Sequence, residues 1–130
     1  MKEHEIISAV KESAGFDSPE HAKQAVLATL KVLGSRLAGG ETSDLAAQLP
    51  PGIAEALPAS GPGQRFGLDE FYQRVAETEE WGCTAQQARQ HARAVLAAIK
   101  ASVTPGEFEH LIDQLPDEYA DLLGIEPVQH

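Results

Sequence analysis

The sequence has little of what holds small secreted or aromatic-rich domains together. It contains one cysteine, Cys83, in 130 residues, so an intramolecular disulfide is excluded. Aromatic residues make up only 5% of the chain, and the core must therefore consist of aliphatic side chains and alanine. Alanine, leucine, glutamine, glutamate and lysine are strong helix formers. The composition therefore favours α-helices.

Long apolar runs are also missing. No stretch approaches the roughly 18 apolar residues that a transmembrane helix needs. The start of the chain, MKEHEIISAVKES, carries charges where a signal peptide has an uninterrupted apolar segment. We therefore expect a cytoplasmic protein that does not enter a membrane.

Positive charge is scarce, with 10 Lys and Arg against 20 Asp and Glu and a net charge of −10. The imbalance is concentrated in the second half, where residues 66–130 hold four basic and twelve acidic side chains. A field of this sign repels phosphate backbones. We expect no binding to nucleic acid.

The two halves of the chain resemble each other. Of the 36 positions from 22 to 57, twelve are identical to the residue 66 positions later. The identical pairs are Ala22/Ala88, Gln24/Gln90, Ala28/Ala94, Leu30/Leu96, Gly40/Gly106, Glu41/Glu107, Leu45/Leu111, Gln48/Gln114, Leu49/Leu115, Pro50/Pro116, Ala54/Ala120 and Leu57/Leu123. We interpret this as an internal duplication within a single compact domain, residues 1–130. Its parts are a first copy at about 5–57, a Pro/Gly linker at 58–67, a second copy at about 68–123 and a tail at 124–130.

Each copy has the apolar spacing of a long amphipathic helix. The apolar positions follow one another at i, i+4, i+7, i+8, i+11 and i+15, which places them on one face of an α-helix of about five turns. They are Ala22, Val26, Thr29, Leu30, Leu33 and Leu37, and then Ala88, Ala92, Val95, Leu96, Ile99 and Val103. The spacing predicts an all-α bundle of about six to eight helices, with the order helix, long helix, short helix, short helix in each half.

Helix ends are marked as well. Ser18 before Pro19 predicts an N-cap followed by proline at the first helical position. Thr84 to Gln87 and Thr104 to Glu107 each have the spacing of a capping box, in which the last side chain reaches back to the first backbone N–H. Gln48 and Gln114 begin the two QLP segments, at which the helix is expected to end. We expect their side chains to bind the backbone groups that are left free at these bends.

At these motifs the chain resembles a known family. The segments RLAGGETSDLAAQLP, FGLDEFYQRVAE and QLPDEYADLL are similar to the bacterial family catalogued as domain of unknown function 2267. The resemblance extends from about Glu5 to Leu123. It implies an all-helical fold built from a repeated unit, and it assigns no catalytic residue.

Two candidate sites for chemistry are weak. Glu107 and His110 have the Glu-x-x-His spacing of di-iron bundles, but such sites need a second Glu-x-x-His and two further glutamates. The alternative is a capping glutamate and a solvated histidine. Cys83 precedes the Thr84 cap, where a helix N-terminus can activate a thiol. His91 is the one base that we expect to be able to approach it in space, and an incidental cysteine is the favoured interpretation.

A third candidate is a binding surface. Arg89, Arg93 and Lys100 form a basic stripe on the second long helix, suited to an acidic peptide or a phosphate. The alternative is a solvated face balanced by nearby acids. With no catalytic constellation, we expect a non-enzymatic protein–protein interaction or scaffold module without a cofactor. The second hypothesis is a sensor of a small ligand or metal, with its pocket between the two halves.

Overall fold

The computed structural model describes residues 2–37, 41–57, 64–79 and 82–125. Across these ranges the chain is all-α, with eight α-helices and one short 3₁₀ helix. In chain order they are α1 (Glu3–Ala14), α2 (Pro19–Arg36), α3 (Glu41–Ala47), α4 (Pro51–Ala54), α5 (Leu68–Thr78), α6 (Ala85–Ser102), α7 (Pro105–Gln114), η1 (Asp117–Tyr119) and α8 (Ala120–Leu123). None of the helices in these ranges is long and apolar enough to traverse a bilayer.

The helix boundaries follow the spacing seen in the sequence. The long helix α6 begins and ends 66 residues after α2, and both have 18 residues, or five turns. In each half a shorter helix precedes the long one and short helices follow it. The predicted order of elements is confirmed. The duplication as such, and the division into copies, linker and tail, remain an interpretation of the sequence.

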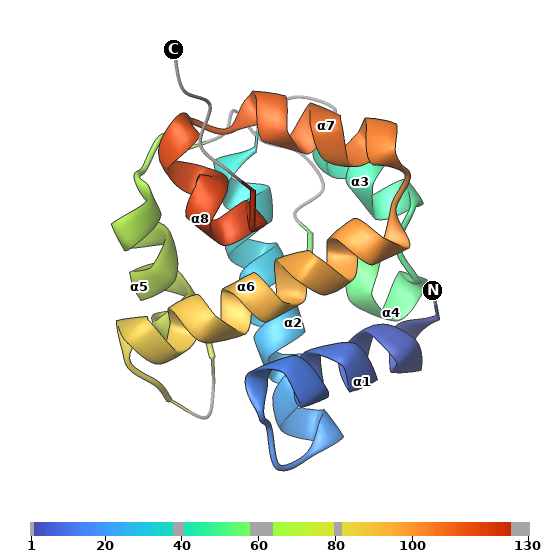
Figure 1. The fold of residues 1–130 in the computed structure, drawn as a ribbon, viewed down its shortest axis with the longest axis vertical. Helices are drawn as coiled ribbons and strands as arrows, with labels where there is room; N and C mark the ends of the chain where they lie inside the picture. The colour runs from blue at the N-terminus through green and yellow to red at the C-terminus, as the bar shows by residue number, and fades with distance from the viewer. Residues whose placement is uncertain (1, 38–40, 58–63, 80–81, 126–130) are drawn as a thin grey trace.

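The long helices cross at the centre of the molecule, with α2 behind α6 in Figure 1. Helix α6 packs against α5 of its own half and equally against α1 of the other half, while α3 lies beside α7. All twelve residues of the two predicted apolar faces are buried. The core is continuous through both halves.

Two of the scarce aromatic residues, Phe71 and Tyr119, pack together in the core. Tyr119 is fully buried, and its hydroxyl donates a 2.7 Å hydrogen bond to the carbonyl oxygen of Phe66. Its ring meets that of Phe71 edge to face, with 5.8 Å between centroids. A buried tyrosine hydroxyl needs such a partner, so this bond fixes the start of the second half against its end.

The helix caps agree with the sequence with one exception. Ser18 accepts a hydrogen bond from the backbone N–H of His21, and Thr84 and Gln87 form the complete predicted box. The box expected from Thr104 to Glu107 forms only in part. Thr104 accepts from the backbone N–H of Glu107, but its own N–H donates to Oε1 of Gln48, at 2.8 Å, and not to the Glu107 carboxylate.

The packing of α3 beside α7 explains why Gln48 replaces Glu107 as the partner of the Thr104 N–H. This packing brings the end of α3 to the start of α7, so that a glutamine 56 residues away in the sequence replaces the local glutamate. Gln48 therefore caps a helix of the other half, rather than binding backbone groups at its own bend. Glu107 is left buried between the two helices.

Replacing Gln48 with alanine should lower the free energy of unfolding by about 0.5–1 kcal/mol, the lower range for loss of a helix cap, because the bond is solvent-exposed. Urea denaturation would measure the change. Gln114→Ala is the matched control, since Gln114 is exposed at the corresponding position and makes no side-chain hydrogen bond within the described residues. Equal effects of the two substitutions would contradict the cross-half cap.

Candidate functional site

Two of the three predicted surface cations converge on one carboxylate. Arg89 donates two hydrogen bonds to Asp121, from Nε to Oδ2 at 2.9 Å and from Nη2 to Oδ1 at 2.7 Å. Arg93 donates from Nε to the backbone carbonyl of Asp121 at 3.0 Å. The hydroxyl of Tyr72 completes the group with a 2.7 Å hydrogen bond to Oδ2. These contacts join α5, α6 and α8.

The electrostatics of this group follow from its contacts. The Arg89 hydrogen bonds lower the pKa of Asp121, although burial acts against them. Burial raises the pKa of Tyr72, and its hydrogen bond to the Asp121 carboxylate raises it further. Arg89 thus pairs with the partly exposed carboxylate of Asp121, while Arg93 and Lys100 remain exposed along α6. The acidic partner of Arg89 is therefore Asp121 of α8.

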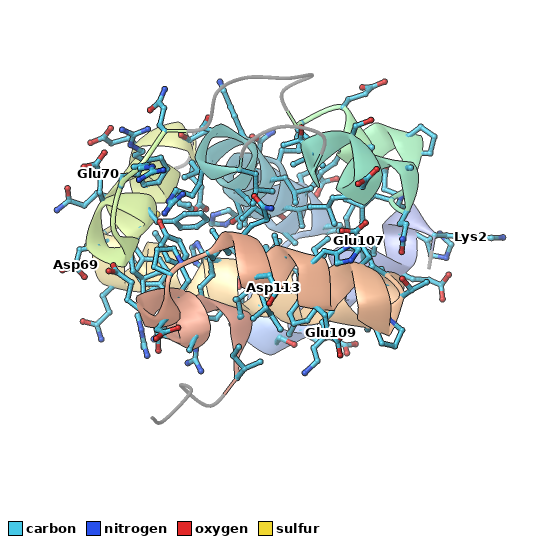
Figure 2. All side chains as sticks on the ribbon, turned by 90° about the horizontal axis from the view of Figure 1, so that it is seen from above. Lys2, Asp69, Glu70, Glu107, Glu109 and Asp113 are labelled. Atoms are coloured by element: carbon cyan, nitrogen blue, oxygen red, sulfur yellow. The ribbon has the colours of Figure 1, made fainter. Side chains whose placement is uncertain are left out.

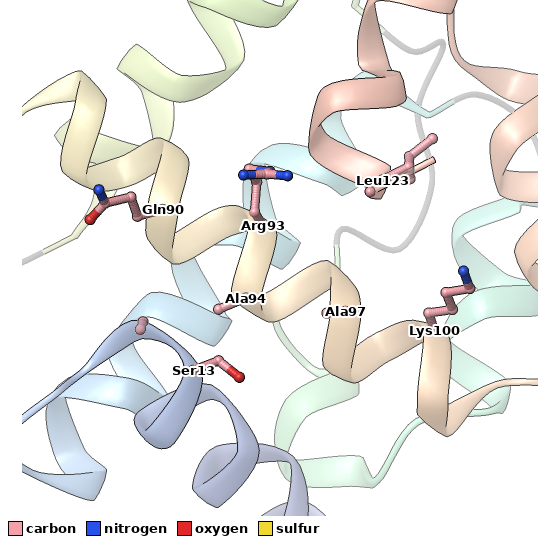
Figure 3. A pocket seen from close by; sticks show the side chains of 9 residues that line it. Ser13, Gln90, Arg93, Ala94, Ala97, Lys100 and Leu123 are labelled. Carbon is pink, nitrogen blue, oxygen red and sulfur yellow. The ribbon is translucent and has the colours of Figure 1, made fainter. Parts of the chain in front are cut away.

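Arg93 and Lys100 border a groove on the outer face of α6. The groove has a volume of about 470 Å³ and lies between the end of α1 and the end of α8 (Figure 3). Its floor is formed by the small side chains of Ala94 and Ala97, and Ser13 of the first half lies on the side opposite Leu123. Residues of both halves therefore line it.

A second groove occupies the corresponding place on α2. It has a volume of about 460 Å³ and lies between the end of α5 and the region of α4. Four of its lining residues stand at the repeat spacing from residues of the α6 groove: Gln24/Gln90, Leu27/Arg93, Ala28/Ala94 and Lys31/Ala97. The two grooves differ in charge, because Lys23, Lys31 and Glu55 line the α2 groove.

Glu107 and His110, the sequence candidates for a metal site, occupy different environments. Glu107 is 6% exposed, lies on the side of α7 that faces α3 (Figure 2), and its Oε2 has no hydrogen-bond partner in the described part of the chain. His110 is exposed. Within those same ranges, no histidine, cysteine or acidic residue joins this pair to make a group of three metal donors. The pair remains a prediction.

A different trio is brought together around Cys83. Its Sγ donates to Oε2 of Glu79 at 3.2 Å, and Nδ1 of His91 lies 3.0 Å from the same oxygen. The carboxylate is almost fully buried, with 1% of its side chain exposed, and the His91 side chain is 12% exposed. Phe16, from the loop between α1 and α2, packs on the His91 ring with 4.5 Å between centroids.

The environment of Cys83 does not activate it as a nucleophile. Burial raises the pKa of the thiol, and the Glu79 carboxylate raises it further, to about 12. A reactive cysteine needs the opposite, a positive environment that favours the thiolate. His91 does approach in space, but Glu79 binds both the imidazole and the thiol.

The match with a protein family agrees with this fold. A family model described as "Uncharacterized conserved protein (DUF2267)" matches residues 3–122, from the start of α1 into α8. The chain belongs to this family. No curated protein matches the chain significantly.

Several features of this DUF2267 chain could not be read from the sequence. The carboxylate of Asp121 lies 32 residues from Arg89, and Ser13 comes from the other half of the chain, so no local spacing links either to α6. The trio around Cys83 is marked in the sequence only by a difference between the two halves. At the repeat spacing, Asp17 and Ala25 stand where the second half has Cys83 and His91, so the second half has a thiol in place of a carboxylate and an imidazole in place of a methyl group.

Proposed function

We propose that the chain is an interaction module whose α6 groove receives an acidic segment of a partner protein. One observation carries the proposal: two cations, Arg93 and Lys100, border the groove, and none of its described lining residues is acidic. The protein as a whole has a net charge of −10. A basic groove on such a surface attracts a complementary acidic segment and disfavours other partners.

The dimensions fit a peptide backbone. Arg93 and Lys100 are seven residues apart on α6, which separates them by about 10 Å along the helix axis. Ala94 and Ala97 between them leave room for a close approach of the partner. Grooves of this kind accept helices that place anchoring side chains at i, i+3, i+4 and i+7. The expected partner is a helical segment with two carboxylates about two turns apart.

The charges near the groove favour one orientation of the partner. Asp121 lies beside Arg93, with 4.0 Å between its Oδ1 and the arginine Nε. Lys100 forms no ion pair with any described carboxylate, and its ammonium lies 5.5 Å from the centre of the Phe108 ring. The more acidic end of the partner should therefore lie at Lys100.

A photo-crosslinking amino acid at position 97 would test the groove, with the cross-linked peptide identified by mass spectrometry. Capture of the same protein should fall at least tenfold in Arg93→Glu/Lys100→Glu. It should be retained in Lys2→Glu/Arg65→Glu, which has the same net charge and changes two exposed residues that do not line the groove. A cross-linked segment without acidic residues, or equal capture by both variants, would contradict the proposal.

A second candidate function is sensing of a small carboxylate ligand in the same groove. Its volume of about 470 Å³ lies in the range of small-molecule pockets, roughly 300–1,000 Å³. Citrate or succinate would then raise the melting temperature of the wild type, as expected for a ligand that binds only the folded state, and would not raise that of Arg93→Glu/Lys100→Glu. Equal shifts in both proteins would remove this candidate.

A further inference from the structure

We propose that Glu79, Cys83 and His91 form a binding site for a divalent metal ion of the zinc class. Each residue offers one ligand atom, and these three atoms all lie within 4.8 Å of one another. Among the described residues, these three side chains form a group close enough together to hold a metal ion. The inference does not depend on the groove on α6.

The geometry is close to that of a coordinated ion. Zinc binds sulfur at about 2.3 Å and nitrogen or oxygen at about 2.0–2.2 Å, so tetrahedral coordination places neighbouring ligand atoms roughly 3.3–3.6 Å apart. Sγ of Cys83 and Nδ1 of His91 lie 3.2 Å and 3.0 Å from Oε2 of Glu79. Small side-chain movements would open the space for an ion between the three atoms.

The backbone holds the three ligands in place. Glu79 is the C-cap of α5, and its N–H donates to the carbonyl of Val75. Cys83 immediately precedes the complete capping box that begins α6, and His91 lies within α6. Gly82, with a φ of +71°, takes a left-handed conformation directly before Cys83, which a residue with a side chain would adopt only with strain.

The burial of the Glu79 carboxylate favours a bound cation. A buried carboxylate is costly unless it is paired or coordinates a metal. The hydrogen-bond partners of the Glu79 carboxylate among the described residues are the thiol and the imidazole, both of which are themselves metal ligands. Phe16 covers one face of the imidazole. Cys83 remains partly exposed, which leaves solvent access to the ion.

The choice of metal follows from the ligand types. One thiolate, one imidazole and one carboxylate suit zinc and related borderline ions, whereas magnesium and calcium prefer oxygen ligands. Binding breaks the S–H bond of Cys83 and forms a sulfur–metal bond, releasing one proton to solvent. Neutral His91 binds through Nδ1 and carries its proton on Nε2. With three protein ligands, water fills the fourth position.

Comparison of the two halves indicates that the fold does not depend on Cys83 and His91. Asp17 and Ala25 stand at the positions of Cys83 and His91 in the first half, where the same arrangement of helices forms without the trio. The fold therefore does not require a thiol or an imidazole at these places.

Cobalt(II) is the first probe, because a thiolate ligand gives it an intense charge-transfer absorption band in the near ultraviolet. The metal-free chain, treated with chelator, should develop this band with a 1:1 end point, and zinc should displace the cobalt and abolish it. Cys83→Ser should lose the band entirely. Loss of a residue that only hydrogen-bonds a metal ligand weakens metal binding by roughly 10–100-fold. Because His91 is a ligand itself, His91→Gln should weaken cobalt binding by more than this.

Thermal unfolding with zinc provides a second measurement that does not depend on the thiolate band. Zinc should raise the melting temperature of the wild type and of the control His110→Ala, but not of Cys83→Ser or His91→Gln, each first shown to be folded by circular dichroism. The proposal is overturned if the wild type shows neither band nor shift. It is equally overturned if the shift persists in Cys83→Ser and His91→Gln or is lost in His110→Ala, which would move the site to Glu107 and His110.

Discussion

At pH 8, the thiol of Cys83 should react with iodoacetamide about three orders of magnitude more slowly in the folded, metal-free protein than in urea. The thiolate is the reacting species, and an unperturbed thiol with a pKa of about 8.5 is about one-quarter thiolate at this pH. The Cys83 pKa is raised to about 12, first by burial and then by Glu79. About one thiol in ten thousand is then ionised at pH 8.

The pH dependence gives the same prediction a second readout. Because the raised pKa keeps the thiol protonated, the alkylation rate of the folded protein should climb about tenfold per pH unit up to pH 11. The unfolded chain should level off near pH 9. Mass spectrometry at timed intervals would follow both reactions.

Glu79→Gln is the informative variant for this reaction. It removes the negative charge beside the thiol while keeping a similar shape, so the Cys83 pKa should fall and alkylation at pH 8 should accelerate. Burial remains the larger cause of the shift, and the variant should therefore stay slower than the unfolded chain. A wild-type rate within tenfold of the unfolded rate would show that Cys83 lacks the described environment.

Leu96→Ala and Leu30→Ala should each lower the free energy of unfolding by about 2–5 kcal/mol, the range for truncation of a fully buried leucine. Both side chains are 0% exposed, at the same position of α6 and α2. Each substitution leaves a cavity at the centre of the molecule, where the long helices cross. Urea denaturation, followed by circular dichroism, would give the midpoint and the slope.

The exposed position Gln86 on α6 supplies the control. Gln86→Ala changes the same helix without removing a buried group, so its effect should stay within about 0.5 kcal/mol. A cost below 1 kcal/mol for either leucine would mean that the apolar faces do not form the shared core. A slope that changes along with the midpoint would indicate loss of two-state unfolding instead.

The helices were predictable because their determinants are local. The twelve apolar positions have helical spacing, and all are buried as expected. Ser18 and Thr84 cap their helices through backbone groups three residues away. Thr104 shows the limit of such reasoning. Its box had the right spacing, but Gln48, which directly follows α3, bound the backbone N–H that the local glutamate was expected to bind.

The candidate sites depend on contacts that no local pattern records. Glu79 and His91 are twelve residues apart, and the packing of α5 against α6 brings them together. The α6 groove needs the end of α1, which reaches it from the other half. Sequence spacing identified Arg93 and Lys100 as surface cations, but tertiary packing alone determines that Arg89 binds Asp121.

The packing of α6 against both α5 and α1 means that neither half encloses its own long helix. A fragment of residues 1–63 would leave one side of α2 bare, and a fragment of residues 64–130 would leave α6 without α1. Neither piece should fold alone, yet the two mixed together should reassemble, each completing the other's interior. A chain that contains only one such unit would be expected to fold in the same way as a homodimer.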